Sequence, residues 1–197
     1  MKLLQHRGWV IVGLTVLFIL GVRVHLRDMP LERDEGEYAY AGQLILHGVA
    51  PYKEAYNMKL PGTYAAYALI MAVFGQTPAG IHFGLALVNV ACVVLLFLVG
   101  RELLDETAGA VAATVFGLLS TSPTILGLAG HATHFVVLPA LAGILLLLKS
   151  PSSDSPGVPR TTRGLFLSGL FLGLAFLIVS MFDRRPTVRA EDEVKRT

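Results

Sequence analysis

Long runs without charge divide the chain into segments that suit a lipid bilayer better than water. No Asp, Glu, Lys or Arg occurs in 60–100, 107–148 or 164–182. A bilayer core about 30 Å thick is crossed by roughly 20 apolar residues in an α-helix. The pattern therefore predicts an all-α fold, a polytopic transmembrane helical bundle. The expected spans, about five in number, are 8–24, 79–99, 108–122, 133–148 and 164–182.

The connections between these spans differ in length and polarity. The first connection, 25–78, is long and holds most of the polar residues. Within it, 60–75 is apolar but short for a span, which favours a helix lying at the membrane interface and leaves a sixth span as the alternative. The Ser/Pro-rich segment 149–163 is expected to be a surface loop, and 183–197 a charged, disordered tail.

Small residues recur at every fourth position in three of the expected spans. In lipid this spacing lets helix backbones approach closely, so it predicts helix packing rather than chemistry. The sets are Gly80 and Gly84; Gly109, Ala113 and Gly117; and Gly169 and Gly173.

Composition supports a membrane protein and excludes other classes. Charged residues make up only 15% of the chain, against about 25% in soluble domains. A net charge of +2 gives no reason to expect nucleic-acid binding, and the single cysteine, Cys92, has no intrachain partner for a disulfide. The apolar stretch 9–22 lacks a cleavage site after it and is predicted to be an uncleaved first span. Basic residues lie on both sides of the expected spans, so charge leaves the orientation open.

Acidic residues gather just after the first span. Asp34 and Glu35 are candidate catalytic groups, because a carboxylate in a low-dielectric setting can have its pKa raised toward neutrality and accept a proton. A structural alternative stands beside this one. Asp34 followed by Glu37 resembles a helix N-cap pattern, for a helix that runs to about His47 and is stopped by Gly48.

Two further sites carry candidate chemistry. Lys59 stands just before Pro61, which favours a helix start, so its ammonium group would join unpaired N–H donors in an anion site. The alternative is a lysine reaching out from an interfacial helix. His131 and His134 are three residues apart at the start of a span, where they could hold a metal or simply be polar residues at a helix end.

The run RDEGEYAYAGQLILHGVAPYKEAYNMKLPG, residues 33–62, resembles the first extracytoplasmic loop of GT-C glycosyltransferases. These include protein O-mannosyltransferases, the aminoarabinose transferase of lipid A and Rgt-type enzymes, loosely glycosyltransferase family 39. The shared pattern is an Asp-Glu pair, a short helix, a Pro-Tyr and a Lys-x-Pro. Residues 127–148 resemble the family's junction between its third and fourth spans, although the acidic residue common near His134 is absent.

The resemblance implies a function and roles for residues. It implies transfer of a sugar, with inversion, from a polyprenyl-phosphate carrier to a glycan, lipid or protein acceptor on the outer side of the inner (plasma) membrane. By matching positions, Asp34 would be the base and Glu35 would orient the site. Lys59 would neutralise the carrier phosphate, and Tyr38 and Tyr52 would line the pocket. No cofactor follows from the resemblance, and a divalent metal is left open.

The resemblance covers about residues 9–177 and then stops. The further helices expected of the family do not follow, so the sequence predicts an N-terminal portion of such an enzyme, whose activity on its own is not established. A second hypothesis belongs to a different class: a non-catalytic membrane module that binds a lipid carrier or pairs with another subunit.

Overall fold

The computed structural model describes residues 7–54, 60–150 and 162–178. These parts are helical and contain no strand, which confirms the predicted all-α fold for them. In chain order the helices are α1 (Arg7–His25), α2 (Arg33–Leu46), α3 (Gly62–Phe74), α4 (Pro78–Leu103), α5 (Glu106–Leu119), the 3₁₀ helix η1 (Pro123–Ile125), α6 (Ala132–Lys149) and α7 (Thr162–Ile178).

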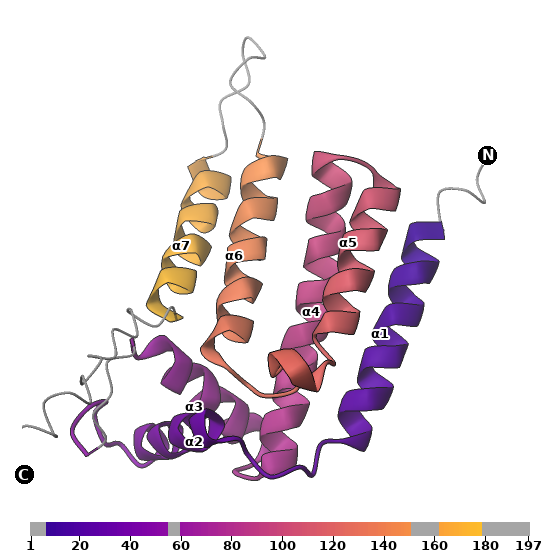
Figure 1. Cartoon of the computed structure of the whole chain (residues 1–197). Helices are drawn as coiled ribbons and strands as arrows, with labels where there is room; N and C mark the ends of the chain where they lie inside the picture. The colour runs from indigo at the N-terminus through magenta and orange to yellow at the C-terminus, as the bar shows by residue number, and fades with distance from the viewer. Residues whose placement is uncertain (1–6, 55–59, 151–161, 179–197) are drawn as a thin grey trace, which may run out of the picture.

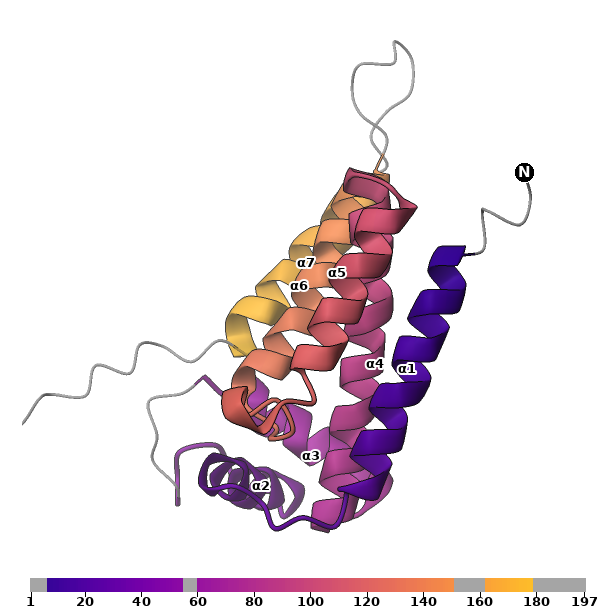
Figure 2. The same cartoon turned by 45° about the vertical axis from the view of Figure 1, so that its right-hand side comes forward.

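Five helices, α1, α4, α5, α6 and α7, stand side by side as a bundle (Figure 1). The other two, α2 and α3, lie together at one end of it, and the connection between α5 and α6 turns at the same end (Figure 2). We call this the loop end of the bundle, and we call residues 120–131, which include η1, the α5–α6 junction. Segments far apart in the sequence therefore meet at the loop end.

Three of the described helices are long and apolar enough to cross a membrane: α1, α4 and α6. Helices α5 and α7 are apolar but shorter, with 14 and 17 residues, so their crossing of the membrane stays a prediction. Helix α3 has 13 residues, a length of about 20 Å against a bilayer core of about 30 Å. This length favours the interfacial interpretation of the segment 60–75 over a sixth span.

Helix α2 begins two residues earlier than the sequence indicated. The N-cap is Glu32, whose side chain accepts a hydrogen bond from the Asp34 backbone N–H, while the Glu35 side chain accepts one from the Glu32 N–H. The prediction that Asp34 caps the helix with Glu37 was therefore wrong. Glutamate is not among the favoured N-cap residues, and for that reason the true capping box was not apparent. The predicted end of the helix at His47 and Gly48 is confirmed.

Glycines bring several helices into close contact, as the recurrence of small residues at every fourth position predicted. A Cβ atom added to Gly109 of α5 would lie 2.6 Å from the Phe97 carbonyl oxygen of α4, and one on Gly117 would meet Ile19 of α1 at 2.5 Å. Added at Gly84 of α4, it would collide with Ile70 of α3. The prediction fails in α7, because a Cβ on Gly169 or Gly173 meets nothing within 4 Å among the described residues.

The substitution Gly109→Ala tests this packing. We expect it to lower the free energy of unfolding by about 1–3 kcal/mol, because the added methyl group must push α4 and α5 apart. Gly13→Ala in α1 is the matched control, since its Cβ meets nothing within 4 Å and alanine is the better helix former by about 1 kcal/mol. Thermal unfolding in detergent measures both. Equal midpoints for the two variants would contradict the close contact.

Candidate functional site

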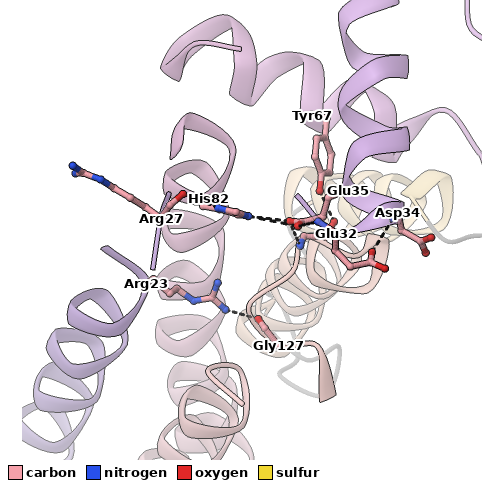
Figure 3. A network of polar contacts seen from close by, with 9 residues as sticks. Arg23, Arg27, Glu32, Asp34, Glu35, Tyr67, His82 and Gly127 are labelled. Carbon is pink, nitrogen blue, oxygen red and sulfur yellow. Dashed lines mark hydrogen bonds and ion pairs between the residues drawn. The ribbon is translucent and has the colours of Figure 1, made fainter. Parts of the chain in front are cut away.

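The first turn of α2 carries a fully buried carboxylate at the loop end. Glu35 is only 1% exposed. One carboxylate oxygen accepts a hydrogen bond from the Glu32 N–H at 3.0 Å, and the other accepts one from the Gly130 N–H at 2.5 Å. The His82 Nε2 atom of α4 lies 3.4 Å from the same carboxylate (Figure 3). Glu35 thus joins α2, α4 and the α5–α6 junction.

These contacts decide the charge of Glu35. Burial by itself raises the pKa of the carboxyl group, but the hydrogen bonds from His82, Glu32 and Gly130 outweigh it and bring the pKa below its ordinary value. The His82 Nδ1 atom lies 2.8 Å from the Arg27 carbonyl oxygen. Since the carbonyl and the carboxylate only accept, an imidazole with protons on both nitrogens satisfies both. Glu35 is therefore an anion with its oxygens engaged, a poor proton acceptor but a strong anchor.

A buried arginine of α1 holds the same junction from the opposite side. Arg23 is 4% exposed. Its Nη2 atom donates to the Ser120 carbonyl at 2.8 Å and to the Gly127 carbonyl at 2.7 Å (Figure 3 shows the second bond). The Ser120 hydroxyl in turn donates to the Asn89 side chain of α4 at 2.9 Å. Charged side chains inside a membrane protein generally pair with other groups or with backbone carbonyls, as here.

Helix α3 supplies a further contact with the junction. The Tyr67 hydroxyl donates to the Gly130 carbonyl at 2.7 Å. Burial, followed by the nearby charge of Glu35, raises the pKa of this phenol, so it remains protonated and keeps its role as donor. A Cβ atom on Gly130 would collide with the Tyr67 hydroxyl and lie 3.0 Å from Glu35. A larger residue at this position would have to displace the Tyr67 hydroxyl or the Glu35 carboxylate from its hydrogen bond.

The second carboxylate of the Asp-Glu pair lies outside this buried network. The Asp34 side chain is 26% exposed, and its nearer oxygen lies 3.8 Å from the His131 Nδ1 atom of the junction. In Figure 3 the Glu32 and Asp34 carboxyl groups lie on the opposite side of Glu35 from His82. Arg33 is 3.5 Å from Asp34 but is almost fully exposed, so this ion pair contributes little. Asp34 is thus accessible at the loop end, whereas Glu35 is not.

The remaining predicted site residues occupy different surroundings. Tyr38 is buried in the core, with its ring centroid 5.5 Å from that of Tyr67. Tyr52 is exposed and contacts Tyr64 edge to face at 6.2 Å. Its backbone has φ of 68°, a left-handed conformation that is rare for an aromatic residue. Lys59 lies outside the described residues.

Sequence reasoning missed Arg23, His82 and Asn89 as parts of the loop end. It gave no role to Arg23, near the end of the first expected span, and did not single out the polar residues of 79–99. The available signal was the presence of His and Asn within an otherwise apolar span, because such residues usually face a partner inside a bundle.

Comparison with known proteins identifies the family to which the chain is similar. Residues 59–181 match the family model described as dolichyl-phosphate-mannose-protein mannosyltransferase. No curated protein and no solved structure matches the chain. The matched region covers α3 to α7 and the α5–α6 junction, while Asp34 and Glu35 lie before it.

The substitution Glu35→Gln tests the anchor. We expect a loss of about 1–3 kcal/mol in the free energy of unfolding, because the glutamine NH₂ group must face a backbone N–H that then lacks an acceptor. Glu54→Gln, at an exposed position, should leave stability unchanged. Circular dichroism during thermal unfolding compares the variants.

The same carboxylate predicts a dependence on acid. The pKa of Glu35 is lower in the folded protein than in the unfolded chain. Its contribution to the free energy of unfolding is therefore fully present above the unfolded pKa, about 4.3. This contribution is lost as the pH falls through the folded pKa. The unfolding temperature should therefore drop between about pH 5 and pH 3, and less steeply in Glu35→Gln. Parallel profiles for the variant and the unchanged protein would contradict an anionic Glu35.

Proposed function

Because the chain belongs to the dolichyl-phosphate-mannose-protein mannosyltransferase family, we propose that it acts in transfer of a sugar from a polyprenyl-phosphate carrier to an acceptor hydroxyl outside the cytoplasm. The family makes it a membrane protein of the glycosyltransferase class. The family's description points to mannose as the sugar and to protein as the acceptor. The proposal places the loop end at the outer surface of the inner (plasma) membrane.

In the proposed reaction Asp34 is the general base. Its carboxylate takes the proton of the acceptor hydroxyl as the hydroxyl oxygen forms a bond to the anomeric carbon. The bond from that carbon to the carrier phosphate breaks on the opposite face, so the configuration inverts and the polyprenyl phosphate leaves with the electron pair. A base must be accessible to the acceptor and within hydrogen-bond reach of its proton. The partly exposed Asp34 side chain meets the first requirement.

The neighbouring carboxylate has a different role in this proposal. Glu35 is a positioning residue, because its oxygens bind the Glu32 and Gly130 backbones and face His82. It fixes the first turn of α2, and with it Asp34, against the junction. Lys59 is proposed to neutralise the carrier phosphate. Tyr52 is proposed to line the pocket, whereas the buried Tyr38 packs α2 against Tyr64 and Tyr67 of α3.

The observation that carries the proposal is this division between adjacent carboxylates. Two acidic residues with contrasting surroundings are a common arrangement in active sites, where one is held charged and the other is left to exchange protons. Glu35 is buried and hydrogen-bonded on both oxygens, while Asp34 faces the open side of the loop end. A capping motif with a purely structural role would need the buried Glu35 carboxylate but not the accessible Asp34 carboxylate.

The substitution Asp34→Asn tests the base. We expect transfer from labelled polyprenyl-phosphate-mannose to a serine-containing peptide to fall by about 10²-fold or more, with thermal stability nearly unchanged because the amide has the same shape. Asp28→Asn is the control, since Asp28 is an exposed carboxylate at the same end. Full activity in Asp34→Asn would remove this residue as the base. Crosslinking of the carrier without any transfer would favour the non-catalytic carrier-binding module.

Orientation can be tested separately with introduced cysteines. We expect a cysteine at Asp28, at the loop end, to react with an impermeant thiol reagent in intact spheroplasts. A cysteine at Glu102, at the other end of α4, should react only after lysis. The native Cys92 is buried and should give little background. The reverse labelling pattern would place the loop end on the cytoplasmic side.

A further inference from the structure

Three side chains that can bind metals converge at the loop end. They are Glu32 and Asp34, from the start of α2, and His131, from the end of the α5–α6 junction. One possible ligand atom from each lies within 4.8 Å of the other two, and each residue is half-buried. His131 is about 100 residues away in sequence, so the fold itself brings it to the two carboxylates.

We propose that Glu32, Asp34 and His131 bind a divalent transition-metal ion such as Mn²⁺ or Zn²⁺. Two carboxylates and one imidazole are a ligand set that these ions accept, with metal–ligand bonds of roughly 2.0–2.2 Å. Ligand atoms on one such ion therefore lie about 3–3.5 Å apart. The 3.8 Å between the His131 Nδ1 atom and the Asp34 oxygen is slightly wider. The three atoms lie within 4.8 Å of one another, so the side chains must rotate to bring all of them to the separations that an ion requires.

The imidazole of His131 is poorly satisfied without an ion. Its Nδ1 atom is too far from Asp34 for a hydrogen bond. Its Nε2 atom is buried and has no hydrogen-bond partner among the residues that the structure describes. The ring nitrogen that faces Asp34 is Nδ1, and an ion between these two atoms would bind both of them.

The acidic side chains retain the capacity to bind. The Oε2 atom of Glu32 accepts the Asp34 N–H bond that caps α2, at 2.8 Å, which leaves Oε1 for an ion. The nearest described cation, Arg33, is exposed and 3.5 Å from Asp34, a surface contact that an ion can displace. Glu35 is an anion nearby but is occupied by its backbone donors. The local charge therefore favours a cation at the three ligands.

The use of such an ion rests on the proposed function. Three protein ligands leave further coordination positions open, and a phosphate oxygen of the carrier could take one of them. A ligand role for Asp34 competes with its role as base, so loss of transfer in Asp34→Asn does not separate the two. Metal binding measured without carrier or acceptor does separate them.

The test titrates the purified chain in detergent with Mn²⁺ and follows the loss of the free-ion signal by electron paramagnetic resonance. We expect saturable binding that Zn²⁺ displaces. Glu32→Gln, Asp34→Asn and His131→Gln should each weaken it by about 10-fold or more, the size of effect that loss of even an outer partner has at known sites. The matched controls Asp28→Asn and His47→Gln change a carboxylate and an imidazole at the same end, and both should bind as the unchanged chain does.

Several outcomes would overturn the proposal. These are the absence of saturable binding, binding that all three ligand variants retain, and equal weakening in the two controls. Circular dichroism spectra must match across the variants, and Glu32→Gln keeps an oxygen that can cap α2, so its loss of binding would not reflect unfolding. Mn²⁺ binding by a chain that transfers no sugar would support the metal site and contradict the proposed function.

Discussion

The burial of one carboxylate constrains the whole loop end. An ionised carboxyl group removed from water costs several kcal/mol unless donors replace its hydration. For Glu35 the donors come from its own helix start, from α4 and from the α5–α6 junction. Each of these segments must therefore be in place for the others to be stable. This requirement acts together with the apolar face of α2, which packs on α3, to position α2 at the bundle end.

The backbone of the α5–α6 junction is subject to the same requirement, that buried polar groups have hydrogen-bond partners. Residues 120–131 contain no Asp, Glu, Lys or Arg, yet Gly127, Ala129 and Gly130 are buried and their peptide groups need partners. Arg23 donates hydrogen bonds to two of the junction's carbonyl oxygens and Tyr67 donates one to a third, while Glu35 accepts one from a backbone N–H. An irregular connection is thereby held in one conformation. That conformation brings His131 beside Asp34.

The sequence predicted the helices well because their signal is local. Uncharged runs locate apolar helices, and Gly48 and Pro61 mark a helix end and a helix start within the first connection. The glycine contacts of α4 and α5 also followed from spacing. The N-cap of α2 was misplaced because glutamate seldom caps. The acidic pair was recognised, but which member is buried depends on Gly130 and His82, and no local pattern connects these positions.

The wide sequence separation of these contacts bears on how the chain is made. The hydrogen bonds of Arg23 to the junction join residues 97 and 104 positions apart, and that of Glu35 to Gly130 joins residues 95 positions apart. Ribosomes add about 5–20 residues per second, so Arg23 and Glu35 wait roughly 5–20 seconds before the junction is synthesised. During that interval two charged groups destined for burial lack the partners that the finished protein provides. The nascent protein therefore depends on the insertion machinery, or on water at the membrane surface, to shelter them.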